Sequence, residues 1–151
     1  MLDVFRVEAV LLDLSADTKG EALERMVAHA IRSKCLPSGR KDEVLKILGD
    51  REERGSTAFG GGMAVPHARV PRLRNAFGLI ARSPAGIDFR ATDGEPVHVF
   101  VMLVSPENRA DDHLATLRWI SGAARHPDFQ SFILQANSAE DVLEVLHERA
   151  P

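Results

Sequence analysis

Residues 97–104, with the sequence VHVFVMLV, are the stretch that most constrains the fold of this chain. The run is nearly continuous in apolar side chains, several of them β-branched. This pattern fits a strand that is covered on both faces, as in an α/β sheet, better than a strand of a one-sided antiparallel sheet. A second strand is predicted over 75–82 (NAFGLIAR), and turn-rich joints at 83–86 and 92–96 separate the pieces. The centre of the chain is therefore predicted to be a β-sheet.

Helical periodicity is found on both sides of this centre. One helix is expected over 18–34 behind Asp17 as its N-cap, and a second has its apolar stripe at 44–48 and ends within 49–55. After the strands, helices are expected over 111–124, over 128–136, and behind a capping box at 138–141. Helices before and after a central sheet predict an α/β sandwich, although the order of the strands cannot be derived from one sequence.

Composition places this fold in an ordinary setting. The 151 residues contain no repeat or linker and are predicted to form a single domain, 1–151. A net charge of -3 gives no electrostatic footprint for nucleic acid or an anionic membrane, and no apolar run approaches the roughly 20 residues that span a bilayer. The one cysteine, Cys35, cannot form an internal disulfide, and the N-terminus lacks a signal-peptide pattern. We expect a cytoplasmic protein that does not insert into membranes.

Chemistry is concentrated in residues 51–69, REERGSTAFGGGMAVPHAR. Three consecutive glycines permit positive φ angles and close approach of the backbone, so that main-chain N–H groups can converge on an anion. Two neighbouring hydroxyl groups can add further donors. The predicted phosphate-binding residues are accordingly Gly60, Gly61, Gly62, Ser56 and Thr57.

His67 follows this loop and is the predicted nucleophile. Pro66 fixes the backbone just before it and biases Val65 to an extended conformation, so that the imidazole is presented from a stiff stem. A neutral imidazole is available near pH 7 because the ordinary pKa of histidine is about 6.5. In-line group transfer tolerates little misplacement of the nucleophile, which makes a stiff stem valuable.

These residues resemble the enzyme IIA domains of the bacterial phosphotransferase system, in the fructose–mannitol–nitrogen class, and most of all the stand-alone nitrogen-regulatory type. The segment GGGMAVPHAR is similar to the loop that presents the phosphorylated histidine in that family. Arg51 opens an Arg-Glu pair sixteen residues before His67, and His113 begins a His-Leu-x-x-Leu helix forty-six residues after it, as in the family pattern. Two departures are Gly61, where the family loop usually has asparagine, and Ala68, where it usually has glycine.

The resemblance implies a type-2 enzyme IIA fold with a central mixed β-sheet flanked by α-helices. It also implies that His67 carries the phosphoryl group, and that Arg51 and His113 stabilise charge on the phosphoryl oxygens. No cofactor and no metal are needed in this scheme. The implied donor is a small histidine-containing phosphocarrier protein, and the implied acceptor is an enzyme IIB or a regulatory target protein.

Two proteins must then bring their histidines together, so the rim around His67 is expected to be exposed and partly apolar. Ala58, Phe59 and Met63 are the residues predicted for this rim. Arg69 is interpreted as a surface residue rather than a phosphate ligand.

Other enzyme classes fit less well. No Lys-Ser/Thr follows 55–60, which excludes a P-loop, and the Gly-x-Ser-x-Gly elbow of serine hydrolases is absent. A metal-dependent hydrolase using His67, His113 and either Asp111 or Asp112 is conceivable, but no two of these ligands have the short spacing typical of such sites. Within the resembled family, a lone domain favours the regulatory role, and sugar uptake with transfer to an enzyme IIB is the alternative.

Overall fold

The apolar run of the sequence is the central strand of the molecule. In the computed structural model, which describes residues 4–148, it forms β6 (Val97–Pro106), whose residues are buried except for the half-buried His98. Alternate side chains point to opposite faces: Phe100 and Met102 belong to one hydrophobic cluster, Val101 and Leu103 to another. Burial on both faces confirms the interpretation of this run.

The sheet is mixed, with the order β1-β5-β6-β3-β2, and β4 also pairs with β6. β5 (Phe77–Ile87) runs antiparallel to β6 along one edge. Along the other edge, β3 (Met63–Ala64) and then β4 (His67–Val70) pair with β6 in parallel. β1 (Phe5–Leu11) is parallel to β5, and β2 (Ala58–Gly60) is antiparallel to β3.

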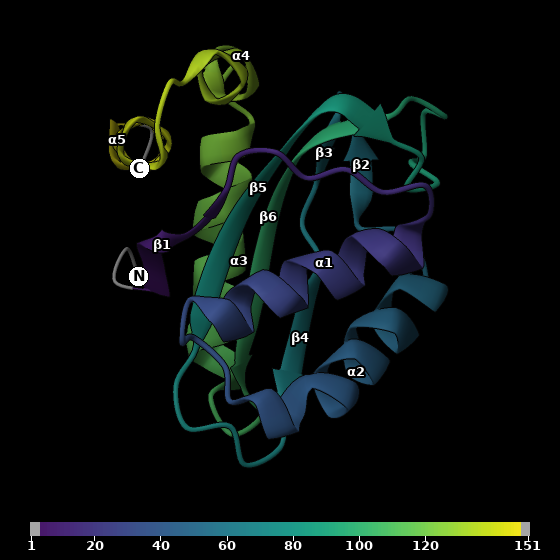
Figure 1. Cartoon of the computed structure of the whole chain (residues 1–151), viewed down its shortest axis with the longest axis vertical. Helices are drawn as coiled ribbons and strands as arrows, with labels where there is room; N and C mark the ends of the chain where they lie inside the picture. The colour runs from purple at the N-terminus through teal and green to yellow at the C-terminus, as the bar shows by residue number, and fades with distance from the viewer. Residues whose placement is uncertain (1–3, 149–151) are drawn as a thin grey trace.

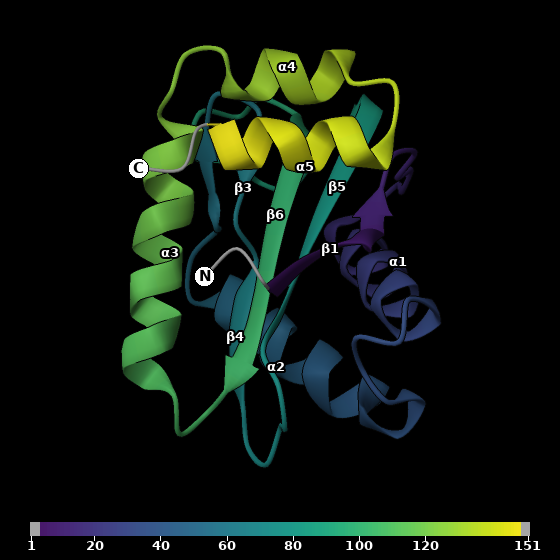
Figure 2. The same cartoon turned by 90° about the vertical axis from the view of Figure 1, so that its left-hand side faces the viewer.

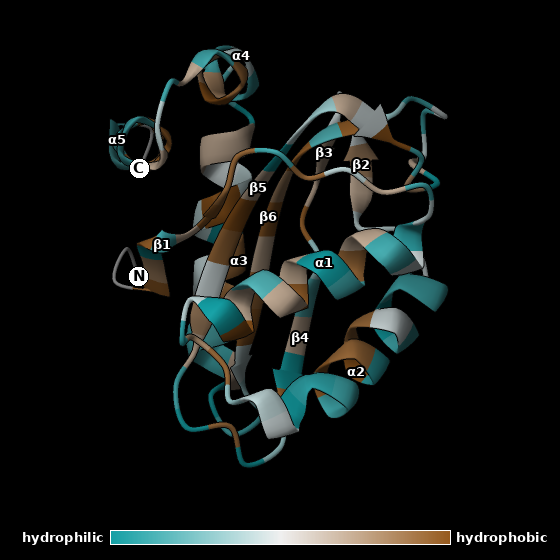
Figure 3. Ribbon diagram, viewed as in Figure 1, coloured by the Kyte–Doolittle hydropathy of each residue, from teal (hydrophilic) through white to brown (hydrophobic). Residues whose placement is uncertain are grey.

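Helices cover both faces of this sheet (Figures 1 and 2). α1 (Lys19–Arg32) and α2 (Lys41–Glu53), joined through the short 3-10 turn η2 (Ser38–Arg40), pack on one face. α3 (Ala110–Ala124), α4 (Phe129–Gln135) and α5 (Ala139–Glu148) pack on the other. Figure 3 shows β6 brown along most of its length, whereas α1 and α2 alternate brown and teal, as amphipathic surface helices do. The predicted α/β sandwich is confirmed.

Two predicted boundaries are wrong for local reasons. Thr18, not Asp17, caps α1, because the Thr18 hydroxyl accepts the Glu21 N–H at 3.1 Å. The end of α2, by contrast, is at Glu53, within the predicted range 49–55. The predicted joint at 83–86 lies within β5, where the register against β6 shifts between Arg82 and Ile87.

Other predictions hold. Ser138 caps α5 by accepting the Asp141 N–H at 3.1 Å, as the capping-box pattern indicated. The helices expected over 111–124 and 128–136 are present as α3 and α4. Among the described residues, no helix combines the length and the apolar character required to cross a membrane.

Candidate active site

His67 lies at the start of β4, between the last turns of α2 and the first turns of α3. It opens onto a cavity of about 310 Å³. The cavity is lined by three arginines, two histidines and three apolar residues, namely Arg51, Arg54, Arg69, His67, His113, Ile47, Ala68 and Leu117. The structure thus brings together the three residues at family spacing, Arg51, His67 and His113.

The backbone fixes the tautomer of His67. Its Nδ1 lies 2.8 Å from the carbonyl oxygen of Val65, and because a carbonyl can only accept, Nδ1 carries the proton. Nε2 is then an unprotonated lone pair, and the Nε–H of Arg51 points at it from 3.3 Å. Burial lowers the pKa of His67, the Val65 carbonyl opposes this, and the charge of Arg51 lowers it further. The side chain is therefore a neutral base with its free nitrogen facing a guanidinium.

The local sequence explains this geometry. Pro66 has no N–H for the ladder and separates β3 from β4, while its carbonyl accepts the Leu103 N–H at 3.0 Å. The Val65 N–H donates to the carbonyl of Thr57 at 3.1 Å, which fixes the residue whose carbonyl holds the imidazole. The predicted stiff stem is thus a pair of anchored peptides on either side of a proline.

Arg51 reaches His67 from the last turn of α2. Its Nη1 donates to the carbonyl of Gly55 at 2.8 Å, so that one end of the guanidinium is held by the turn that follows the helix. The other edge faces the imidazole. An arginine placed in this way keeps its charge and presents several N–H donors in one plane.

His113 lies in the first turn of α3 and is 7% exposed. Its Nδ1 lies 2.8 Å from the hydroxyl oxygen of Ser105, and its ring centroid is 5.7 Å from that of His67. Burial, followed by the charges of His67 and Arg69, lowers the pKa of His113 to about 4. Both imidazoles are therefore neutral near pH 7.

Sequence reasoning missed Arg69 and Ser105. Arg69 follows His67 by two residues in β4, so both side chains lie on the same face of the strand, and this spacing was the available signal. Ser105 pairs with Arg69 across the ladder and holds His113. The interpretation of Arg69 as a mere surface residue is therefore incomplete: it is exposed, but it lines the His67 cavity.

The glycines lie elsewhere. Gly60 ends β2, and Gly61 and Gly62 form the turn into β3; all three have positive φ, and none lines the cavity around His67. Met63 pairs with Val99 and His67 with Leu103, four residues further along β6. At about 3.3 Å per residue this separates the turn from the histidine by roughly 13 Å. The predicted glycine cradle for phosphate is not formed beside His67.

The two predicted hydroxyl donors are also engaged in other contacts. The Ser56 hydroxyl donates to the carbonyl of Phe89 at 3.0 Å, and the Thr57 hydroxyl donates to the carboxylate of Glu52 in a short hydrogen bond. Neither residue lines the cavity around His67. The prediction that these two residues bind phosphate is therefore wrong, because the hydrogen of each hydroxyl group is used in a hydrogen bond that stabilises the fold.

The predicted apolar rim is wrong as well. Ala58 and Met63 are buried at 0% and 3% exposure, and the exposed Phe59 lies beside the glycine turn. The helices supply Ile47 and Leu117 to the lining of the cavity instead. Leu114, which follows His113 in α3, is 48% exposed and does not line the cavity.

Asp111 and Asp112 lie in the first turn of α3, and Asp112 forms an ion pair with Arg109 at 3.2 Å. Within residues 4–148, no three His, Cys, Asp or Glu side chains gather as the ligands of a metal ion would. The geometry therefore gives no support to the hydrolase alternative.

Comparison with known proteins assigns the family. Residues 3–149 match the family model described as phosphoenolpyruvate-dependent sugar phosphotransferase system, EIIA 2. The chain is 35% identical over 144 residues to a nitrogen regulatory protein of Bradyrhizobium diazoefficiens, covering 95% of this chain and 92% of the relative. It is 31% identical over 142 residues to a fructose-specific EIIA component of Haloferax volcanii, covering 94% and 91%.

A solved structure agrees with this assignment. The nitrogen regulatory protein IIA-Ntr of Neisseria meningitidis superposes with a TM-score of 0.87 at 28% identity, covering 96% of this chain and 97% of the other. The family match and the fold both extend over nearly the whole chain. The chain therefore belongs to the type-2 enzyme IIA family of the phosphoenolpyruvate-dependent phosphotransferase system.

Proposed function

We propose that this protein is a histidine phosphocarrier that accepts a phosphoryl group on Nε2 of His67. One observation carries the proposal: the Val65 carbonyl keeps the proton on Nδ1, which leaves Nε2 as the lone pair that faces the arginine-lined cavity. In the transfer, a new bond forms between Nε2 and phosphorus while the phosphorus–nitrogen bond of the donor's phosphohistidine breaks. The electron pair of that bond returns to the donor imidazole.

Arginine charge would serve the transition state. Phosphoryl transfer depends on positioning and on stabilising the charge of the equatorial oxygens. Arg51 would exchange its hydrogen bond to Nε2 for one to the incoming oxygens, since its Nη1 is already anchored on Gly55. Arg54 and Arg69 line the same cavity and add positive charge at its mouth.

His113 would assist after transfer. Its ring lies against that of His67 and is neutral, so it can offer an N–H to a phosphoryl oxygen without adding a charge that the donor protein would have to desolvate. The first turn of α3 adds the favourable end of a helix dipole for an anion.

The proposed donor is a small histidine-containing phosphocarrier protein, and the proposed acceptor is an enzyme IIB or a regulatory target. A regulatory role of the nitrogen type is favoured by the relative from Bradyrhizobium diazoefficiens, which is a nitrogen regulatory protein. Sugar uptake remains the second candidate because the relative from Haloferax volcanii is described as fructose-specific. Donor and acceptor would dock in turn on Ile47 and Leu117, which line the cavity, and on the exposed Leu114 of the first turns of α3.

The test is intact-mass analysis after mixing the protein with phosphoenolpyruvate, enzyme I and the histidine-containing phosphocarrier. We expect one acid-labile phosphoryl group, absent in His67→Ala and retained in His147→Ala, which removes an exposed histidine of α5. His113→Ala should still accept the group but pass it on slowly. No gain by the natural protein, or a gain that survives His67→Ala, would refute the proposal.

The same phosphorylated protein distinguishes the two roles. Incubated with a purified enzyme IIB of the fructose type, a sugar-uptake component should lose its phosphoryl group within minutes. A regulator of the nitrogen type should retain it, and its retention would favour the first candidate.

A further inference from the structure

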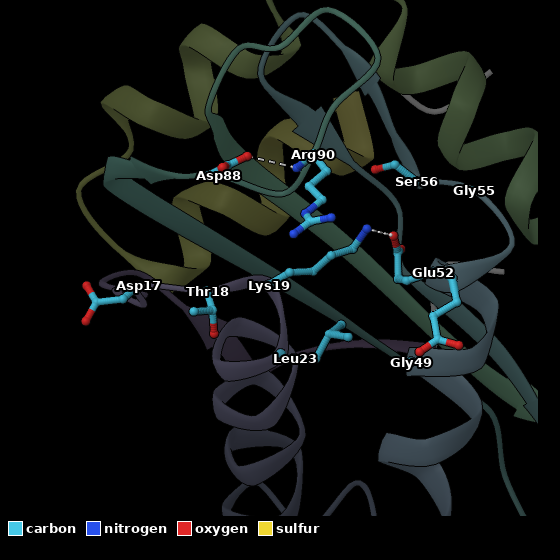
Figure 4. Close-up of a pocket in the computed structure, with 12 residues that line it drawn as sticks. Asp17, Thr18, Lys19, Leu23, Gly49, Glu52, Gly55, Ser56, Asp88 and Arg90 are labelled. Carbon is cyan, nitrogen blue, oxygen red and sulfur yellow. Dashed lines mark hydrogen bonds and ion pairs between the residues drawn. The ribbon is translucent and has the colours of Figure 1, made fainter.

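Glu52 is a buried carboxylate next to Arg51 in α2, and it is 6% exposed. Burying a carboxylate is costly unless it is paired and hydrogen-bonded. Three donors meet this one: the Lys19 ammonium at 2.7 Å, the Thr57 N–H at 3.1 Å, and the Thr57 hydroxyl in a short contact. Figure 4 shows the ion pair between Lys19 and Glu52 at the edge of a cavity of about 740 Å³.

The contact closes a turn. Glu52 lies in the last turn of α2 and Thr57 follows five residues later, so the two contacts of Thr57 fasten the intervening segment 53–56 to the end of the helix. The Gly55 N–H also donates to the Glu52 carbonyl at 3.2 Å. Gly55 has φ +149, in the region that favours glycine.

This turn holds both nitrogen atoms of His67 through the backbone. The Gly55 carbonyl anchors Arg51, whose Nε–H faces Nε2 of His67. The Thr57 carbonyl accepts the Val65 N–H, and the Val65 carbonyl in turn accepts the Nδ1–H of His67. Two independent chains of hydrogen bonds therefore run from the turn that Glu52 closes to the imidazole.

We propose that Glu52 and Thr57 are positioning residues that hold His67 in its reactive tautomer and Arg51 in line with it. They touch neither the imidazole nor the cavity in which the phosphoryl group would lie. Their role in transfer rests on the proposed phosphocarrier function. Their effect on the tautomer and pKa of His67 does not, because it exists in the unphosphorylated protein.

Lys19 supports the pair from α1. Its ammonium also lies 4.7 Å from the centroid of the Phe89 ring, which fixes it between the ring and the carboxylate. Because Lys19 touches only Glu52 in this chain of contacts, its removal should loosen the turn less than the loss of the Thr57 hydroxyl.

The variant Thr57→Val tests the proposal, because it removes the hydroxyl and preserves shape and backbone. We expect phosphoryl acceptance to slow by about tenfold, as a modest displacement of a nucleophile and its arginine costs in group transfer. Thr57→Ser, which restores the hydroxyl, should recover most of the rate. The matched control is Thr116→Val, since Thr116 is equally buried and its hydroxyl bonds only the Asp112 carbonyl within its own helix.

The second readout is the ¹⁵N spectrum of His67 in the unphosphorylated protein. In Thr57→Val, the Nε2 signal should move toward a mixture of tautomers and the pKa of His67 should fall, because the Val65 hydrogen bond, which raises this pKa more than the Arg51 charge lowers it, is loosened. Thr116→Val should leave both unchanged. A role in stability alone would lower the melting temperature without moving these signals.

Glu52→Gln provides a second variant if Thr57→Val does not fold, and it should shift the His67 signals in the same direction. Natural rates together with natural ¹⁵N shifts in either folded variant would overturn the proposal. If the natural protein itself takes up no phosphoryl group, the proposed function fails, and the spectra still decide whether Glu52 and Thr57 control the imidazole.

Discussion

The glycine turn at 60–62 and the cavity around His67 are separated by only a few residues of sequence, yet they are different regions of the molecule. The turn joins β2 to β3 at one end of the sheet, whereas His67 pairs with Leu103 nearer the other end of β6. The cavity combines three arginines with two neutral imidazoles. In the glycine turn, by contrast, a backbone N–H donor is already bonded to another group of the protein.

Asp93 shows how. Its carboxylate accepts the Gly61 N–H at 3.0 Å and the Glu95 N–H at 3.0 Å, and these backbone donors lower the pKa of Asp93. The turn thus already binds an anion, the side chain of the protein itself. A second anion would meet a negative charge there, whereas at His67 it would meet positive ones. Glycines that can bind an anion need not bind the one that reacts.

The largest expected contrast is in the rate of phosphoryl acceptance. Arg51→Gln should slow acceptance by about a hundredfold, as the loss of one preorganised donor to the transition state does. Gly61→Ala strains the backbone at φ +69 but should leave the rate unchanged, because the turn does not line the cavity around His67 and the added methyl group would meet nothing within 4 Å. Single-turnover transfer measures both. An equal loss in Gly61→Ala would mean that the turn takes part in the chemistry after all.

Acid should also distinguish the two regions. The folded pKa of His113 is about 4 and its ordinary value is 6.5, so the neutral form stabilises the protein fully above pH 6.5 and progressively less as the pH falls toward 4. We expect a loss of about 2 kcal/mol in the free energy of unfolding over that interval, allowing for partial screening.

Denaturant titrations at several pH values measure that loss. His113→Gln should flatten the curve between pH 6.5 and 4, although the pKa of His67 is also lowered and leaves a residual slope. Asp93→Asn should keep the natural slope in this window, because the pKa of Asp93 is lowered from 3.8 and its titration lies further into acid. A flattened curve in Asp93→Asn alone would contradict the account.

Substitution of a glycine in the turn should lower the free energy of unfolding, although it should not change the transfer rate. Gly62→Ala should cost about 1 kcal/mol, because a non-glycine residue at φ +83 is strained. The added Cβ would also clash with the amide nitrogen of Gln130, whose flexible side chain can move aside. Thermal unfolding measures the loss, and the transfer rate should remain natural. A slowed transfer at full stability would assign the turn a functional role.

The smallest effect concerns docking. Leu114→Asp should raise the KM for the phosphocarrier by about fivefold, since a charge on an exposed apolar residue adjacent to His113 in the sequence disfavours a partner. Phe59→Asp, at the glycine turn, alters an equally exposed apolar residue and is the matched control. Should Phe59→Asp raise KM and Leu114→Asp not, the docking surface would lie on the face first predicted from the sequence.

The sequence was most informative for elements that are long enough to show a hydrophobic pattern. Residues 97–104 and the apolar stripes of the helices predicted β6 and the layers, because burial imposes a pattern that single substitutions do not hide. The spacing of Arg51, His67 and His113 predicted residues that the structure brings together. Short strands were missed: β3 has two residues and β4 four, too few for a period to emerge.

The placement of the glycine loop could not be predicted because it depends on where the chain becomes extended. An irregular loop of seven residues could fold back and bring the glycines close to His67. β3 and β4 are extended instead, and they carry the chain along β6 and away from the glycine turn. Arg69 was recoverable in principle, since a residue two after His67 shares its face once β4 is known. Ser105 carries no such signal, because only the pairing of β4 with β6 places it near His113.

The central claim is that Nε2 of His67 accepts the phosphoryl group. It is tested most directly by ³¹P and ¹⁵N NMR of the phosphorylated protein, which identify the nitrogen that is bonded to phosphorus. We expect a single phosphohistidine, at His67, with coupling from phosphorus to Nε2 and the proton retained on Nδ1. Phosphorus on Nδ1 of His67, or on His113, would contradict it.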